Sequence, residues 1–443
     1  MDTIYPFFQK GLQLLAEEDP ILYQLIEREQ KRQANVLAMI ASSSLADPSV
    51  LVCEGTQITN VTVEGYPGAR YHAGCEVVDQ IETLAIERAK KAFGAQYANV
   101  QPHSGTTANQ IVMFSLLRPG DTILGLDLKS GGHLSHGAKA SASGNYFNAI
   151  SYGLDDTGFI DYEQVERLAH EHRPTLIICG SSAYPRTIDF ARFRQIADSV
   201  SSYLLADISH ISGLVVAGEH PSPINHAHFT TTSTYKQLYG PRGGLILIGK
   251  DHQSSAPGGK RTLSQLMQSA VFPFFQGTPN LSAIAAKARC LERVMLPEFN
   301  SLAQMIISNA KTIASVLKEH EYPVVTGGTD NHMVLFDVLA KGITGVIAER
   351  ALERCNIIVN KNNLPGDVKS PLVTSGIRLG TNSLAVRGMG SDSMQQCVDL
   401  IHTVLSALKP LDDKQYELPV EVEQSVQREV QSLCDQFPIP RYP

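Results

Sequence analysis

The chain has 443 residues and a formal net charge of −7, with 43% hydrophobic and 18% charged residues. This length allows two or three packed domains, and the balance is typical of a soluble globular protein rather than a general nucleic-acid binder or a membrane protein. The seven cysteines are scattered without a CxxC pair, which argues against a disulfide framework or a metal site and favours a cytoplasmic location.

In chain order, the first region, residues 1–54, is expected to form an N-terminal helical arm. Its segment from Ile21 to Ile40 carries apolar residues at helical spacing. The last region, residues 293–443, is expected to form a smaller C-terminal α+β domain. A long helical stretch from Ala283 to Lys318 leads into it.

Between these regions, residues 55–292 alternate short apolar runs with longer amphipathic segments. Helices are predicted from Val77 to Phe93 and from Ser104 to Leu117, and strands at Thr122–Leu126, Thr175–Cys179, Tyr203–Ala206 and Gly244–Ile248. Strands that alternate with helices predict an α/β domain with a mostly parallel sheet. Because ligands of such sheets bind beyond the carboxyl ends of the strands, the residues that follow each strand are candidate site residues.

Two of these positions predict a pyridoxal-phosphate site. Lys236 follows a run of threonines and precedes a glycine-rich turn that leads into an apolar strand. Burial there would lower its pKa and make the amine nucleophilic, as a Schiff-base lysine requires. Asp207 ends a predicted strand, where a carboxylate can pair with a protonated pyridine nitrogen. Alone, the lysine could be a surface cation and the aspartate a helix cap; together they favour the cofactor.

Two further motifs fit the same cofactor. The segment His103 to Thr107 places small hydroxylated residues and a glycine at a helix start, which offers N–H donors and a positive dipole end to a phosphate. Gly131-Gly132-His133 combines glycines that permit close backbone approach with an imidazole that can stack on an aromatic ring. Helix capping without a ligand and an ordinary polar histidine are the simpler interpretations.

These motifs resemble those of the serine hydroxymethyltransferase family, and the resemblance covers nearly the whole chain. The matching segments are Ile40-Ala41-Ser42, Gly65-Tyr66-Pro67-Gly68, Asn99 to Gly105, Ala183-Tyr184, Gly328 to His332 and Thr374 to Arg378. The resemblance implies the aminotransferase-like fold type I of pyridoxal-phosphate enzymes and tetrahydrofolate as co-substrate. It also implies an obligate homodimer whose active sites share residues, and leaves open whether dimers pair into tetramers.

The resemblance implies a role for each matching position. Lys236 would bind the cofactor covalently, Asp207 would hold its pyridine nitrogen, and His133 would stack on its ring. The other implied cofactor contacts are Ser104, Gly105, Thr106, Ser182, His210, Ser233 and, from the neighbouring subunit, Gly277. The implied substrate contacts are Ser42, Tyr71, the acid–base group Glu64 and the carboxylate clamp Arg378. The implied folate contacts are Glu64, Tyr71, Leu128, Gly132 and Asn362.

Several of these neighbourhoods depart from the family pattern. Thr62 and His72 stand where the family has tyrosines, and both are candidate catalytic positions. The other changes are Tyr235 for a histidine, Phe274-Phe275 and Thr278 for glycines, Ser43-Ser44 for Glu-Asn, and Ser130 for a histidine. Threonine in place of tyrosine frees about the volume of an aromatic ring near the substrate α-carbon. A substrate pocket enlarged in this way can accept one more methyl group on the α-carbon.

The favoured hypothesis is therefore hydroxymethyl transfer between α-methylserine and tetrahydrofolate, giving D-alanine and 5,10-methylenetetrahydrofolate, as in the α-methylserine branch of the family. Cleavage of the Cα–Cβ bond needs no α-proton, so a quaternary carbon is no obstacle. Ordinary serine–glycine transfer is the first alternative, and a folate-independent aldolase or transaldolase is the second. The last is a catalytically silent scaffold protein, against which the retained Lys236, Asp207, Glu64 and Arg378 argue.

Overall fold

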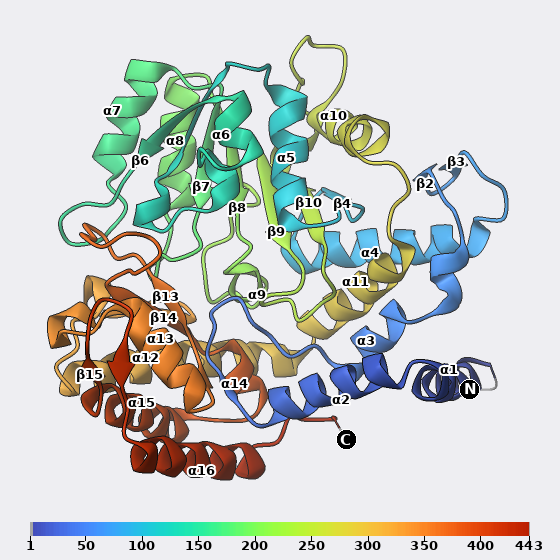
Figure 1. Cartoon of the computed structure of the whole chain (residues 1–443). Helices are drawn as coiled ribbons and strands as arrows, with labels where there is room; N and C mark the ends of the chain where they lie inside the picture. Colours follow the sequence, from blue (N-terminus) through green and yellow to red (C-terminus); the bar gives the residue numbers. More distant parts are fainter. Residues whose placement is uncertain (1–2, 443) are drawn as a thin grey trace.

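The centre of the molecule is a seven-stranded sheet with the order β4-β10-β9-β8-β7-β5-β6 (Figure 1). The computed structural model describes residues 3–442. Neighbours from β9 to β6 pair in parallel, whereas β10 is antiparallel to both β9 and β4. The strands are β4 (Tyr97–Asn99), β5 (Thr122–Leu126), β6 (Asn148–Tyr152), β7 (Leu176–Gly180), β8 (Tyr203–Asp207), β9 (Phe229–Ser233) and β10 (Gly244–Ile248). The predicted α/β fold with a mostly parallel sheet is confirmed.

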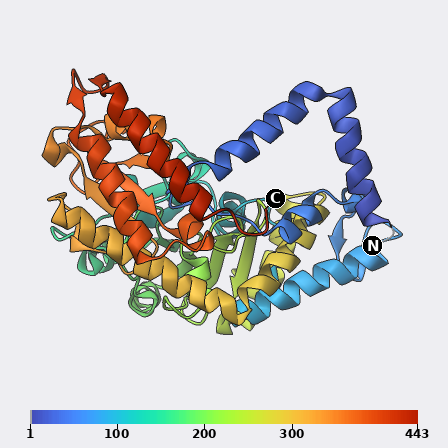
Figure 2. The same ribbon diagram turned by 90° about the horizontal axis from the view of Figure 1, so that it is seen from below.

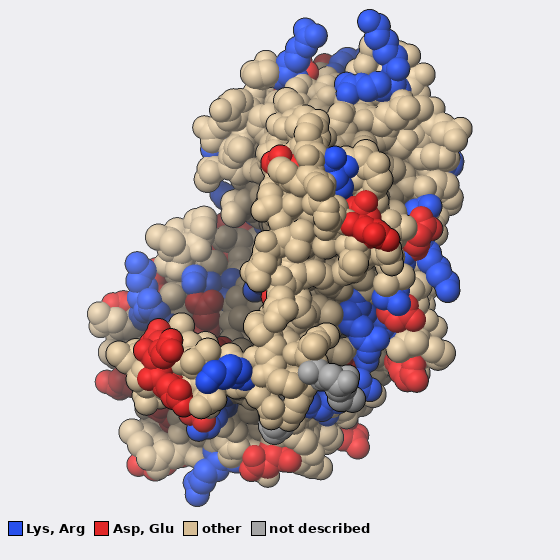
Figure 3. Space-filling model, turned by 90° about the vertical axis from the view of Figure 1, so that its right-hand side faces the viewer, with Lys and Arg blue, Asp and Glu red and all other residues tan. Residues whose placement is uncertain are grey.

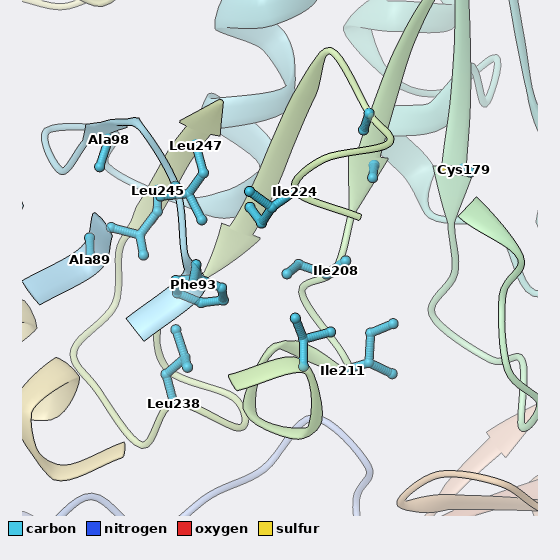
Figure 4. Close-up of a cluster of buried hydrophobic side chains, with 14 of the residues drawn as sticks. Ala89, Phe93, Ala98, Cys179, Ile208, Ile211, Ile224, Leu238, Leu245 and Leu247 are labelled. Carbon is cyan, nitrogen blue, oxygen red and sulfur yellow. The ribbon is translucent and has the colours of Figure 1, made fainter. Parts of the chain in front are cut away.

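Helices cover both faces of this sheet, because side chains alternate between the two faces along each buried strand. In β10, Leu245 and Leu247 join one hydrophobic cluster, in which Phe93 lies beside them (Figure 4). Ile246 and Ile248 join a second cluster on the opposite face. The first cluster includes α4 (Glu76–Phe93), α7 (Tyr162–His172), α8 (Phe190–Ser199) and α11 (Leu281–Val294), and the second α5 (Gly105–Leu116) and α10 (Leu263–Ser269).

The C-terminal part has a hydrophobic core of its own around a three-stranded antiparallel sheet. Its strands are β11 (Met333–Asp337), β14 (Gly376–Gly380) and β13 (Asn360–Asn362), and its helices are α12 (Pro297–Glu319), α13 (Gly345–Arg354), α14 (Asn382–Val386), α15 (Ser391–Ser406) and α16 (Val420–Gln436). The long helix expected from Ala283 to Lys318 is in fact two helices, α11 and α12. Leu296 is extended because it precedes Pro297, which starts the new helix.

The N-terminal arm consists of α1 (Ile4–Glu18) and α2 (Pro20–Ala34), which form an arch that stands away from the rest of the protomer (Figure 2). Neither helix buries a side chain in its described part, and Ile4, Leu12 and Ile21 are all more than half exposed. The helical spacing expected to continue to Ile40 ends at Ala34. Beyond it, β1 (Leu37–Ala38) pairs in parallel with β12 (Ile357–Ile358), so this segment joins the C-terminal core.

Shorter elements complete the fold: α3 (Pro48–Glu54), the hairpin of β2 (Gly65–Tyr66) and β3 (Ala69–Arg70), α6 (Ala142–Tyr146), α9 (Ser212–Val216), and the pair β15 (Lys409–Pro410) and β16 (Tyr416–Glu417). Among residues 3–442, no helix is both long enough and apolar enough to cross a membrane.

A buried lysine ties α11 to the loop that enters α5. The ammonium group of Lys287 donates hydrogen bonds to the carbonyl oxygens of Val100 at 2.6 Å, Pro102 at 3.0 Å and Gly244 at 3.0 Å. Burial lowers the pKa of Lys287 to about 7. Val100 and Pro102 lie in the loop before Ser104, and Gly244 is the first residue of β10. The lysine therefore fixes the path of the backbone where this loop meets the sheet.

Replacing Lys287 with methionine should lower the free energy of unfolding by about 3 kcal/mol, because buried carbonyls would lose their donor. Urea denaturation at fixed protein concentration measures this change. The exposed Lys91 of α4 supplies a control, since Lys91→Met should change stability by less than about 0.5 kcal/mol. Equal stability of the two variants would contradict the anchoring role.

Candidate active site

The carboxyl ends of β8 and β9 and the start of α5 enclose a cavity of about 200 Å³. Polar side chains and glycines line most of it. They are Ser104, Gly105, Thr106, His133, Ser181, Ser182, Asp207, Ser209, His210, Ser233, Tyr235, Lys236, Arg242 and Gly243. The position agrees with the rule that open α/β sheets bind ligands beyond their carboxyl ends. We call this space the Lys236 cavity.

Lys236 enters the cavity from the turn that follows β9. The turn is held by hydrogen bonds from the Thr234 N–H to the Gly243 carbonyl at 3.0 Å and from the Gly240 N–H to the Thr234 carbonyl at 2.9 Å. The lysine is only 7% exposed, and this burial lowers its pKa to about 8. A larger share of the amine is therefore neutral near pH 8 than in an ordinary lysine, which makes it a nucleophile for an aldehyde.

Asp207 lies at the end of β8 and accepts four hydrogen bonds. Its Oδ2 accepts from the amide of Asn109 at 2.7 Å and from Nε2 of His136 at 3.0 Å. Its Oδ1 accepts from the N–H and the hydroxyl of Ser209, at 3.0 and 2.6 Å. Burial alone would raise the pKa of Asp207, but the hydrogen bond from His136 and the other donors outweigh it and hold the pKa well below its usual value.

The same network explains a cluster that could be mistaken for a metal site. The ligand atoms of His133, His136 and Asp207 all lie within 4.8 Å of one another. However, His136 already donates to Asp207, and His133 Nδ1 interacts with the Ser135 hydroxyl at 2.7 Å. The hydrogen bond from His136 therefore supports an ionised carboxylate, which suits a protonated pyridine nitrogen.

The start of α5 supplies the part of the cavity that fits a phosphate. Ser104 caps the helix by accepting a hydrogen bond from the Thr107 N–H at 3.0 Å. A Cβ atom on Gly105 would lie 3.2 Å from Ser209 Oγ and from Ser233 Cβ, so only glycine leaves this corner open. The buried hydroxyl of Ser233 has no hydrogen-bond partner within residues 3–442. Helix N–H groups together with such a hydroxyl suit an anion.

His133 and His210 both line the cavity. Gly131, at φ +97°, turns the chain before His133, and a Cβ on it would lie 2.5 Å from the carbonyl of Ala183. The absence of a side chain on Gly131 thus allows a close approach to the protein backbone at Ala183. Burial lowers the pKa of His133 to about 4 and that of His210 well below its usual value. Both rings are therefore neutral, and His210 stacks on His332 with their centroids 5.8 Å apart.

Taken together, the cavity fits pyridoxal phosphate. It combines a buried amine, an ionised carboxylate and a helix N-terminus, and its buried Ser233 Oγ and His210 Nδ1 lack partners in the described chain. All nine positions expected to contact the cofactor from the same subunit line this one space: Ser104, Gly105, Thr106, His133, Ser182, Asp207, His210, Ser233 and Lys236.

Arg378 of β14 reaches the edge of the cavity. Its Nη1 donates to the carbonyl of Ser182, and its Nε donates to Asn360 Oδ1 at 3.1 Å. Burial lowers the pKa of Arg378 to about 10, so the guanidinium remains charged at neutral pH. Ser42 lines an adjoining cavity of about 520 Å³, which Tyr235 and Arg242 also line.

A second group of expected site residues lies apart from the Lys236 cavity. The Tyr71 N–H donates to the Glu64 carbonyl at 3.0 Å, and His72 Nε2 lies 3.8 Å from Glu64 Oε2. A Cβ on Gly277 would lie 3.5 Å from Glu64 Oε1, so the loop of Gly277 adjoins this hairpin. None of these residues, nor Thr62, is among those that line the Lys236 cavity.

The expected folate positions are also separated within one chain. Leu128 is half exposed in a turn next to Gly131. A Cβ on Gly132 would lie 2.0 Å from the Leu126 carbonyl, so this glycine is required for backbone packing. Asn362 ends β13 and donates to the Asn363 carbonyl at 2.6 Å.

The sequence interpretation did not single out the groups that hold Asp207. Asn109 lies one turn into α5, and His136 lies three residues after His133. Each lies a few residues from a motif that the sequence interpretation recognised, and this proximity was the signal that could have found them. Only the fold shows that both bind the same carboxylate. His332, which stacks on His210, was likewise seen only as part of a longer motif.

A mostly parallel sheet with a buried lysine and aspartate at its carboxyl edge defines a pyridoxal-phosphate-dependent transferase of fold type I. The family model described as "Serine hydroxymethyltransferase" matches residues 15–401. The chain is 49% identical over 425 residues to a probable serine hydroxymethyltransferase of Rickettsia bellii, with 96% of this chain and 98% of the relative covered. It is 46% identical over 434 residues to the serine hydroxymethyltransferase of Chromohalobacter salexigens, with 98% and 100% covered.

A third relative, "Serine hydroxymethyltransferase 2" of Ralstonia nicotianae, is 46% identical over 440 residues, covering 99% of this chain and 100% of the relative. The chain therefore belongs to the serine hydroxymethyltransferase family, whose members are one-carbon transferases that use pyridoxal phosphate and, as co-substrate, tetrahydrofolate.

Cofactor-free protein should react with added pyridoxal phosphate at a rate that rises with pH and levels off above about pH 8. Only the neutral amine attacks an aldehyde, and the folded protein lowers the pKa of Lys236 to about 8. Stopped-flow absorbance measures the rate. A rate that continued to rise towards the ordinary lysine value, roughly pH 10.4, would contradict this environment. Lys236→Arg, which cannot form the bond, is the control.

Proposed function

We propose that this enzyme transfers a hydroxymethyl group between a β-hydroxy amino acid and tetrahydrofolate, with serine and glycine as the amino-acid pair. The observation that carries the proposal is the buried Lys236 amine in one cavity with the ionised Asp207. The names of the relatives support serine as the donor.

The residues of the chain would divide the work as follows. Pyridoxal phosphate, when bound, supplies an electron sink for the pair left at Cα when the Cα–Cβ bond breaks. Lys236 would hold the cofactor covalently, while Asp207 keeps a proton on its ring nitrogen. Arg378 would bind the substrate carboxylate with its guanidinium. His133, neutral because it is buried, would lie against the ring without adding a competing charge.

Glu64 would move the proton of the substrate hydroxyl, from a position supplied by a second subunit. Support comes from its place outside the Lys236 cavity, together with Tyr71, which is 72% exposed, and the loop of Gly277. The side of the protomer that carries α1 and the β2–β3 hairpin also presents a broad band of uncharged surface (Figure 3). A homodimer would cover this band and bring Glu64, Thr62 and His72 to the neighbour's cavity.

A second candidate donor is α-methylserine, with D-alanine as the product. Thr62 and His72 favour it, because both are smaller than the tyrosines of the family pattern and both are exposed in the protomer. The names of the relatives do not support this specificity. Both candidates need the same Cα–Cβ cleavage and differ only in whether the site accepts a methyl group on Cα.

The two candidates are separated by rates with methylenetetrahydrofolate and either glycine or D-alanine. Faster turnover of glycine supports the serine enzyme, and faster turnover of D-alanine supports the α-methylserine enzyme. In either case Thr62→Tyr should raise the ratio of glycine to D-alanine turnover by about tenfold, since one methyl group in a tight pocket changes rates roughly 10- to 200-fold. Thr59→Tyr, on the neighbouring exposed turn, is the matched control.

An unchanged ratio in Thr62→Tyr would show that position 62 does not contact the α-substituent. Turnover of serine without any folate would instead favour a folate-independent aldolase, and absence of turnover with every donor would contradict the proposed function.

A further inference from the structure

Tyr235, directly before Lys236, has surroundings that the proposed roles leave unused. Its side chain is half-buried, and it lines both the Lys236 cavity and the adjoining cavity that contains Ser42. Arg242 lines the same two cavities. These two residues therefore stand where the expected cofactor space meets the expected substrate space.

The tyrosine ring lies close to two cations. The guanidinium carbon of Arg242 lies 3.7 Å from the ring centroid of Tyr235, and Lys236 Nζ lies 5.9 Å from it. A guanidinium that stacks on a ring uses its face, so its N–H groups stay available at the edge. The stack thus fixes the orientation of the phenol and keeps a positive charge at the boundary of the two cavities.

Two further observations connect Tyr235 to the substrate side. The hydroxyl of Ser44 donates to the Tyr235 carbonyl, which ties the residue to the segment of Ser42. Arg378 donates to the carbonyl of Ser182, and Ser182 and Tyr235 both line the Lys236 cavity. A phenol O–H can donate a hydrogen bond to a carboxylate, and such charge-assisted bonds are among the stronger ones in proteins.

We propose that Tyr235 and Arg242 form a second recognition element for the substrate carboxylate, beside Arg378. In this arrangement the Tyr235 hydroxyl donates a hydrogen bond to the carboxylate, and Arg242 orients the ring and adds favourable charge. The inference rests on the proposed function, because it assumes that an amino acid enters the Lys236 cavity.

The test compares cofactor-loaded wild-type protein with Tyr235→Phe, which keeps the ring and the stack but removes the hydroxyl. Binding of L-serine without folate is titrated by the change in cofactor absorbance, and 2-aminoethanol serves as the analogue without a carboxylate. Tyr235→Phe should weaken L-serine binding about tenfold, the effect of one hydrogen bond to a charged group, and should leave 2-aminoethanol binding unchanged. Tyr146→Phe, at an exposed tyrosine, is the control and should match wild type.

Arg242→Gln provides an independent variant at an exposed position, should Tyr235→Phe fold poorly. It should also weaken L-serine binding several-fold and spare 2-aminoethanol. Equal losses for both ligands, or no loss for either, in both variants would overturn the carboxylate role while leaving the proposed function intact. Failure of wild-type protein to bind any amino acid would overturn the proposed function and this inference with it.

Discussion

The site depends on one buried charge, the Asp207 carboxylate at the end of β8. A carboxylate out of water is costly unless donors surround it. Asn109, His136 and Ser209 supply these donors from three different segments of the chain. The sheet, α5 and the turn after His133 must therefore all be in place before the charge is stabilised, which makes the site a product of the complete domain.

Parallel strands bring the chemistry together because their carboxyl ends share one edge. β8 ends in Asp207, and the neighbouring strand β9 leads to the turn that carries Lys236, so the two residues face one cavity. Both residues were predictable from local signals: Asp207 ends an apolar strand, and Lys236 lies between a run of threonines and a glycine-rich turn. The four strands that were predicted, β5, β7, β8 and β10, lie within one residue of their expected ends, whereas β4, β6 and β9 were not predicted.

Other features could not be read from local patterns. The pairing of β1 with β12 joins residues more than three hundred positions apart, and the apolar spacing before it continues the helical pattern of α2. Pro297 divided a long apolar stretch whose periodicity suggested one helix. The donors to Asp207 were missed because a histidine or asparagine carries no sign of its partner until the fold is known. The grouping of Glu64, Tyr71 and Gly277 away from the Lys236 cavity likewise needed the folded protomer.

The most direct measurement of the central claim is borohydride reduction of protein loaded with pyridoxal phosphate, followed by peptide mapping. The label should lie on Lys236, the lysine that lines the cavity with Asp207. Lys287 is a strict internal comparison, because burial lowers its pKa even further, to about 7, while its amine is fully engaged by backbone carbonyls. A label on Lys287, or protein that remains unlabelled, would contradict the assignment of the site.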